Sequence, residues 1–87
     1  MYRLEIRKSV EKIFFKLAKK DPEQLDAISK KIEEIRLNPH HYKNLRKPLH
    51  HLRRVHIDKS FVLAFSIKES KKLVIIEEYD HHDKIYK

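Results

Sequence analysis

In the first part of the chain, the apolar residues recur first at the spacing of a strand and then at the spacing of a helix. Residues 1–7 place an apolar side chain at every second position, which is the period of a half-buried strand. Ser9 stands where a helix N-cap belongs, and the apolar residues after it follow the i, i+3, i+4, i+7 spacing of one helix face. These residues are Val10, Ile13, Phe14 and Leu17. The pattern predicts a strand that leads into an amphipathic helix ending near Lys20.

A second helix is predicted directly after the first. Asp21 is a suitable N-cap, Pro22 suits the first helical position, and Gln24 stands at the third. The next apolar stripe consists of Leu25, Ile28, Ile32 and Ile35. Asn38 and Pro39 end the pattern, because proline cannot continue the helix. Two amphipathic helices in succession make a helical hairpin.

The second part of the chain has the period of strands. Residues 39–49 contain two prolines and no regular period, so we expect a basic loop there. Three strands should follow, and the segment "FVLAFSI" at 61–67 is apolar on both faces, as expected in the middle of a sheet. The predicted order is β-α-α-β-β-β. It describes one α+β domain spanning residues 1–87, with a two-helix hairpin packed on one face of a mostly antiparallel four-stranded sheet.

The predicted central strand has two unlike faces. The face expected to meet the helices is bulky and consists of Phe61, Leu63, Phe65 and Ile67. The other face has the small residues Val62, Ala64 and Ser66, and we expect it to be uncovered. Arg54 and His56 of the preceding strand would line it, and "DHHD" at 80–83 would close one end. The sequence thus predicts a shallow basic groove that contains imidazoles.

Composition narrows the classes of function. The 87 residues include 21 Lys and Arg against 13 Asp and Glu, a net charge of +8 before seven histidines are counted. This surplus favours a polyanionic partner, either nucleic acid or an acidic protein segment, although a merely soluble charged surface is the alternative. The absence of glycine excludes phosphate-binding and dinucleotide loops, and the absence of cysteine excludes disulfides.

No targeting or membrane segment is apparent. No stretch approaches the roughly 20 consecutive apolar residues of a membrane span, and the N-terminus lacks the hydrophobic region of a signal peptide. We therefore expect a cytoplasmic protein without membrane contact.

Histidine chemistry suits the predicted groove. An imidazole has an ordinary pKa of about 6.5, so it can give or take a proton near neutral pH. Cleavage of RNA by its own 2′-hydroxyl needs a base for that hydroxyl, an acid for the leaving 5′-oxygen and cations around the phosphorus. Histidine beside Arg or Lys fills all three roles without a metal. Tyr86 could stack on a base or anchor the terminus on the sheet, and His56 is equally compatible with an ordinary surface position.

Zinc is the competing interpretation of a histidine-rich chain. Adjacent histidines do not point to one face of a regular element, the HExxH motif is absent and no thiolate is available. We therefore expect no metal and no other cofactor.

The chain resembles the RelE/ParE superfamily of toxin–antitoxin toxins along essentially its whole length. The resemblance rests on the strand, the helical hairpin, "NLRKPL", the strand meander and the terminal "HHDKIY", and "HIDKSFVLAF" is most similar to the YafQ-like branch. It implies a RelE-like fold and a ribosome-dependent mRNA interferase, which cleaves A-site mRNA by 2′-hydroxyl attack without a metal. It also implies the ribosome, mRNA and an acidic RelB-like antitoxin that neutralises the basic face as partners.

The resemblance implies the site residues as well. His56 matches the branch's strand histidine, His82 its terminal histidine, and Tyr86 the aromatic residue four positions later. These three are the expected catalytic residues, with His82 as general acid and His56 as base or phosphate ligand. The residues expected to bind substrate are Arg46, Lys47, Arg53, Arg54, Phe61 and His81.

Two positions depart from the family pattern. Ser60 stands where the YafQ-like branch often has aspartate, so it cannot supply the expected carboxylate, and the sequence leaves open whether Asp58 compensates. Val62 stands where RelE-like members carry an arginine that stabilises the phosphorane. Either a neighbouring basic residue supplies that charge, or the histidine-based chemistry of the YafQ-like branch operates, which we favour.

Two other functions are compatible with the sequence. A ParE-like toxin shares the fold and poisons DNA gyrase by binding it, without catalytic residues, so it would not require the histidines and Tyr86. A member that has lost activity and only binds nucleic acid or antitoxin is the third possibility. Val62 is its best support.

Overall fold

The computed structural model describes residues 1–49 and 51–85. The chain forms, in order, β1 (Arg3–Ile6), α1 (Lys8–Lys20), α2 (Pro22–Leu37), the 3-10 helix η1 (Pro39–His41), β2 (Arg53–Ile57), β3 (Phe61–Lys68), the 3-10 helix η2 (Glu69–Lys71), β4 (Leu73–His81) and α3 (His82–Ile85). The predicted order of strands and main helices is confirmed. The two 3-10 turns and the short α3 were not predicted.

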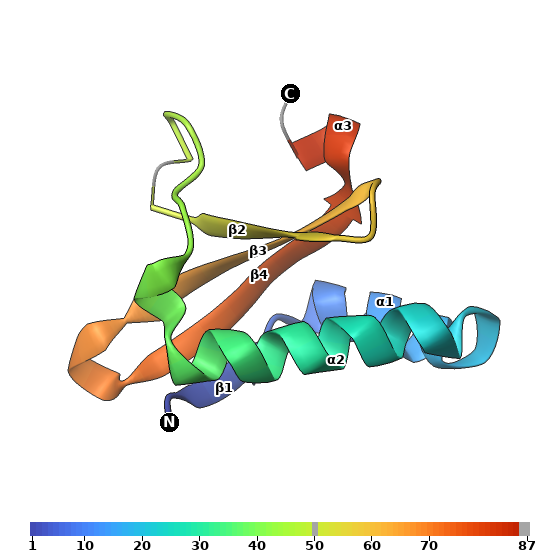
Figure 1. Ribbon diagram of the computed structural model, residues 1–87, viewed down its shortest axis with the longest axis horizontal. Helices are drawn as coiled ribbons and strands as arrows, with labels where there is room; N and C mark the ends of the chain where they lie inside the picture. Colours follow the sequence, from blue (N-terminus) through green and yellow to red (C-terminus); the bar gives the residue numbers. More distant parts are fainter. Residues whose placement is uncertain (50, 86–87) are drawn as a thin grey trace.

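The four strands form one open mixed sheet with the order β1-β4-β3-β2. The strands β2, β3 and β4 are antiparallel neighbours, and β1 pairs in parallel with β4, so the first strand lies beside the last. Both long helices lie on one face of this sheet (Figure 1). The predicted α+β class and the position of the helical hairpin are therefore confirmed.

The main core lies between the helices and the sheet. The inward stripes of α1 and α2 meet the bulky face of β3, as predicted from their spacing. Its buried residues are Val10, Ile28, Ile32, Ile35, Ile57, Leu63, Phe65, Val74, Ile76 and Tyr79. Two predicted members differ. Ile13 is 36% exposed, because Val10, Phe14 and Leu17 already fill the contact between α1 and the sheet, and Leu25 is only half-buried and is not among the described residues of this core.

The two helices begin differently. The α2 cap is as predicted: the Asp21 side chain accepts a hydrogen bond from the Gln24 amide at 3.1 Å, and Pro22 is the first helical residue. The prediction that Ser9 caps α1 is wrong, because the helix begins at Lys8 and Arg7 occupies the cap position without a side-chain bond. The Arg7 amide still bonds to the carbonyl of Ile76 at 3.1 Å, so the strand runs up to the first turn of the helix.

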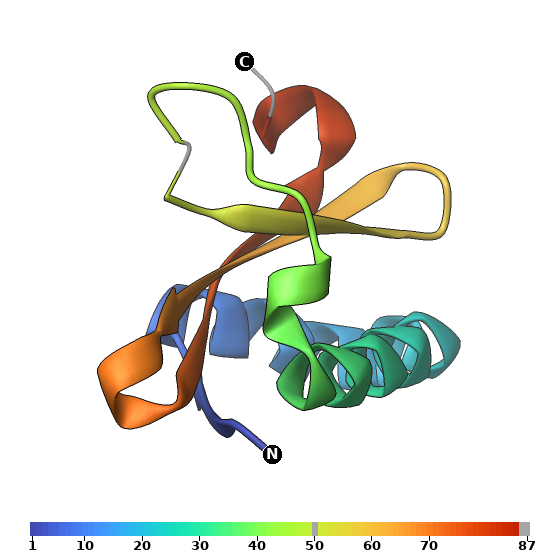
Figure 2. The same ribbon diagram turned by 60° about the vertical axis from the view of Figure 1, so that its left-hand side comes forward.

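The second face of the sheet is covered at one end, contrary to the prediction. Val62 and Ala64 are completely buried there. They lie in a small core with Leu45, Leu49 and Leu52 of the loop and Ile85 of α3. Figure 2 shows this loop and α3 on the side of the sheet away from the long helices.

Backbone hydrogen bonds hold residues 43–49 and 51–54 in place. The Leu45 amide bonds to the Leu52 carbonyl at 2.8 Å, and the Arg54 amide to the Lys43 carbonyl at 3.0 Å. The segment is therefore an ordered flap over the sheet, and its leucines fill the space that the small residues of β3 leave.

Two turns use the left-handed backbone region without glycine. Asp58, between β2 and β3, has a φ of 54°, and Lys72, between η2 and β4, has a φ of 48°. Aspartate tolerates this region better than most residues, whereas lysine has no such advantage.

Candidate functional site

A pocket opens on the second face, next to the small core. It has a volume of about 350 Å³ and is lined by Arg46, Arg54, His56 and His82. We call it the histidine pocket. The residues come from the loop, from β2 and from α3, and none of these four lining residues is acidic. The predicted basic groove is thus present as a compact pocket at one end of the sheet.

The strand β2 positions two of the four residues. Arg54 is paired with Ala64, and His56 with Val62, so both side chains lie on the face that carries the small core. Val62, which is paired with His56, is fully buried on this face. Arg54 is a lining residue of the pocket.

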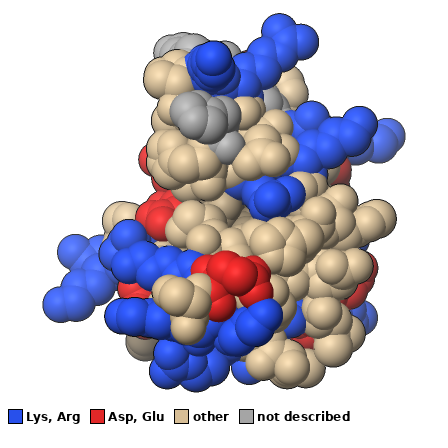
Figure 3. All heavy atoms as spheres, turned by 90° about the vertical axis from the view of Figure 1, so that its left-hand side faces the viewer, with Lys and Arg blue, Asp and Glu red and all other residues tan. Residues whose placement is uncertain are grey.

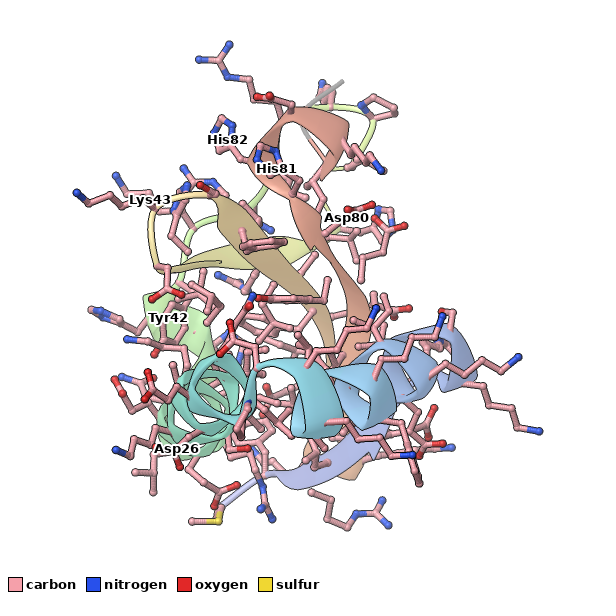
Figure 4. The ribbon with its side chains drawn as sticks, turned by 90° about the vertical axis from the view of Figure 1, so that its right-hand side faces the viewer. Asp26, Tyr42, Lys43, Asp80, His81 and His82 are labelled. Atoms are coloured by element: carbon pink, nitrogen blue, oxygen red, sulfur yellow. The ribbon has the colours of Figure 1, made fainter. Side chains whose placement is uncertain are left out.

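His82 is held by the start of α3. Its amide bonds to the carbonyl of Ser60 at 2.6 Å, and Ile85, one turn further, is buried in the small core. The His82 ring lies against that of His56, with centroids 5.7 Å apart and planes inclined by 27°. Figure 4 shows His82 at the junction of β4 and α3. The two predicted catalytic histidines are thus in contact.

A carboxylate lies beside His82. Asp83 Oδ1 is 3.5 Å from His82 Nδ1, and Asp83 Oδ2 is 3.8 Å from His81 Nδ1. The exposed Asp83 carboxylate therefore stands beside both terminal imidazoles. This contact was not predicted, although Asp83 directly follows His82 in the sequence.

Asp58 does not line the histidine pocket. Burial raises the pKa of the Tyr79 phenol, and the negative charges of Asp58 and Asp21 add to that rise, although a hydrogen bond with Gln24 opposes it. Asp58 therefore acts on Tyr79, which faces the main core. Ser60 contributes its backbone carbonyl to His82 and no carboxylate.

Arg46 enters the pocket from the loop. Leu45, directly before it, is buried in the small core, and the Arg46 carbonyl accepts the Leu49 amide at 2.9 Å. Lys47 is exposed on the same loop and is not among the residues that line the pocket. The basic character of this side of the molecule is visible in Figure 3.

Three predicted substrate-binding residues lie on the other face. Arg53 pairs with Phe65 and donates a hydrogen bond from Nη1 to the Tyr42 carbonyl at 2.6 Å. Phe61 stacks on Tyr79 at 5.4 Å, and the His81 ring meets Phe61 edge-on at 5.7 Å. The structure therefore separates Arg53, Phe61 and His81 from the histidine pocket. Tyr86, the third predicted catalytic residue, lies outside the described residues.

The described residues form no metal-binding cluster and no membrane span. Within residues 1–49 and 51–85, no three His, Asp or Glu side chains come together as metal ligands would. In the same ranges, no helix is both long and apolar enough to cross a bilayer.

Solved structures with the same architecture show which fold this is. The chain superposes with a TM-score of 0.77 on a chain of the RelBE2 toxin–antitoxin complex of Mycobacterium tuberculosis, covering 93% of this chain and 91% of that one at 20% identity. For YafQ of E. coli the TM-score is 0.70 at 16% identity, with both chains fully covered. These likenesses show that the fold is that of RelE/YafQ-type toxins.

A closer relative shows the family. The chain is 60% identical over 87 residues to the protein named "Putative toxin RelE4" of Methanocaldococcus jannaschii, covering all of this chain and 93% of that protein. No protein-family model matches the sequence. The chain belongs to the RelE family of toxins.

Proposed function

We propose that this RelE-family protein is the toxin of a type II toxin–antitoxin system and acts as a ribosome-dependent mRNA endonuclease in the cytoplasm. The observation that carries the proposal is the histidine pocket, in which two arginines surround two stacked imidazoles. This set of groups suits a phosphodiester: cations for its oxygens, and two groups that exchange protons near neutral pH.

The proposed reaction is an attack of the RNA on itself. His56 takes the proton of the 2′-hydroxyl, and the 2′-oxygen forms a bond to phosphorus. The bond from phosphorus to the 5′-oxygen breaks, and His82 gives that oxygen a proton. The products are a 2′,3′-cyclic phosphate and a 5′-hydroxyl. Protons and electrons balance without a metal or a cofactor.

The surroundings of His82 support its role as the acid. The Asp83 carboxylate, with Oδ1 3.5 Å from His82 Nδ1, stands beside the ring and can hold its orientation. The hydrogen bond to Ser60 fixes the backbone of His82, so the ring is presented from a defined position. Arg46 and Arg54 then stabilise the charge of the phosphorane, the role that an arginine at the position of Val62 has in related toxins.

An antitoxin partner follows from the family and the charge. The relative in Mycobacterium tuberculosis was solved as a toxin–antitoxin complex. With a net charge of +8, this chain would attract an acidic antitoxin that neutralises the basic surface around the pocket.

Primer extension on ribosome-bound mRNA tests the proposal. The wild-type protein should cut within the A-site codon, and His82→Ala should slow single-turnover cutting by about 10² to 10⁴-fold, as expected for loss of a general acid. His56→Ala should also slow it. His41→Ala is the matched control, because His41 is an exposed histidine of η1 outside the pocket.

The outcomes separate the competing functions. Equal cutting by wild type, His56→Ala and His82→Ala would refute the assigned site. If no RNA is cut while DNA gyrase loses supercoiling activity, the protein is a ParE-like toxin. If neither activity appears and RNA or antitoxin still binds, it is a binding module.

A further inference from the structure

The four residues that line the histidine pocket come from segments of unequal rigidity. Arg54 and His56 belong to β2, every residue of which is paired with β3. Arg46 lies in the flap, and His82 lies in α3, a helix of four residues. Because isolated helices shorter than about 12 residues are marginal in water, α3 depends on its tertiary contacts. Two of the four groups therefore need a support that pairing within the sheet does not supply.

The small core reaches both of these groups. Leu45 directly precedes Arg46 in the flap, and Ile85 stands one turn after His82 in α3. The side chains of Leu45 and Ile85 are each 5% exposed and belong to the same cluster, which joins the flap to α3 over the sheet (Figure 2). The position of the arginine relative to the histidine therefore depends on apolar packing.

The floor of the small core belongs to the strand pair that carries the other two pocket residues. Val62 and Ala64 are completely buried in this cluster. In the register of β2 and β3 they are the partners of His56 and Arg54. Opposite residues of an antiparallel pair have Cβ atoms about 4.5 to 5.5 Å apart. All four groups of the pocket therefore adjoin one apolar cluster.

The two ends of this face of the sheet differ in chemistry. At the end away from the pocket, Ser66 donates a hydrogen bond to Glu77 Oε2 at 2.6 Å, and Glu77 Oε1 accepts one from Arg7 Nε at 2.9 Å. The described members of the small core come from the flap, β3 and α3. A polar network thus occupies one end of the face, and the apolar cluster stands at the end where the reacting groups lie.

We propose that Leu45 and Ile85 are positioning residues for RNA cleavage and act as one unit through the small core. Leu45 holds Arg46 at the phosphate. Ile85 holds His82 at the leaving 5′-oxygen. The inference rests on the proposed function, and neither buried side chain touches the substrate itself. A displacement of about 1 Å at a reacting group costs about 10²-fold in rate, so a loosened cluster would leave the pocket present but slow.

Single-turnover cleavage of ribosome-bound mRNA tests the proposal at a temperature where every variant is folded. Ile85→Ala should lower the maximal rate constant about 10²-fold without changing the half-saturating toxin concentration, because His82 acts only on the leaving group. Leu45→Ala should lower the rate constant and also raise the half-saturating concentration, because Arg46 meets a phosphate that is charged before the reaction. Ile85→Val keeps most of the packing and should recover most of the rate.

Ile32→Ala is the matched control, because it makes the same substitution in the main core, at a side chain that is 6% exposed against 5% for Ile85. It should lose stability and still cleave like the wild type. The double variant Leu45→Ala with Ile85→Ala should be slowed by less than the product of the two single effects, as expected for residues of one cluster. Multiplicative effects, or an equal loss of rate in Ile32→Ala, would overturn the proposal.

Nuclear Overhauser effects between the ring protons of His56 and His82 give a readout that does not need activity. The ring centroids are 5.7 Å apart, so the wild type and Ile32→Ala should show the effect, and Ile85→Ala should lose it. Retention of the effect in Ile85→Ala would overturn the positioning role of Ile85. If the wild type cuts no RNA, the proposed function fails, whereas loss of the ring contact in Ile85→Ala alone would still show that Ile85 holds His82.

Discussion

The two faces of the sheet are covered by very different amounts of protein. On the helix face, ten of the described residues form the main core, from both long helices and three strands. On the other face, five buried residues form the small core, held by a loop and by the four-residue α3. The histidine pocket lies on this lightly covered face. Stability and the candidate chemistry are therefore separated, and the site can change without loss of the scaffold.

The largest expected effect belongs to the main core. Phe65 is fully buried, and Phe65→Ala should lower the free energy of unfolding by about 3 to 5 kcal/mol, because it removes a large apolar group and leaves a cavity. Urea denaturation monitored by circular dichroism measures this loss. A loss below about 1 kcal/mol would mean that the helix face does not dominate stability.

A substitution in the small core should act more locally. Ile85→Ala removes the anchor of α3 and should cost about 2 kcal/mol, at the lower end of the range for such changes, because α3 can detach. Hydrogen exchange should become faster at His82, whose amide bonds to Ser60, and remain unchanged in α2. Equal acceleration in α2 would show that the two faces unfold as one unit.

The N-cap of α2 should contribute less to stability than the buried core of the helix face. Asp21→Ala removes the acceptor of the Gln24 amide and should cost about 1 kcal/mol of unfolding free energy. Ser9→Ala is the matched control, because Ser9 does not cap α1, and its urea midpoint should match the wild type. An equal loss of unfolding free energy in both variants would show that the Asp21 cap does not stabilise α2 specifically.

The smallest effect concerns the β3–β4 turn, where Glu69 bonds to His40 of η1 and to Tyr2 before β1. Hydrogen bonds from Lys72, His40 and Tyr2 lower the pKa of Glu69 to about 2 from its ordinary 4.5. A lowered folded pKa gives stability that is present above the unfolded pKa and is lost as the pH falls from about 4.5 through about 2. Since Glu69 is exposed, solvent screening keeps the effect small.

Thermal unfolding across this pH range measures the contribution. Glu69→Gln should melt below the wild type at pH 6, and the difference should shrink as the pH falls toward 2. A constant difference at all pH values would contradict a role for the ionised carboxylate.

Periodicity explains why the helix face was predictable. Residues such as Ile28, Ile32 and Ile35 repeat at the spacing of a helix, and their burial follows from that spacing alone. The prediction of a Ser9 cap is wrong because Arg7 is the cap residue, and its amide bond to the Ile76 carbonyl of β4 fixes the start of the helix.

The other face was predicted only in part. His56 and Arg54 were placed correctly by strand alternation, and the same alternation could have separated Arg53 from them. The burial of Val62 could not be derived, because it depends on leucines of an aperiodic loop and on Ile85 near the end of the chain. The contact between His56 and His82 depends on the same tertiary packing.

The left-handed turns at Asp58 and Lys72 have a consequence for the unfolded chain. Each non-glycine residue in this region costs about 1 kcal/mol or more in the folded state. Glycine would remove that cost, but it would also give the unfolded chain more conformations to lose on folding. A chain with no glycine at all has a comparatively restricted unfolded ensemble, so part of its resistance to unfolding is entropic and is invisible in any contact of the native structure.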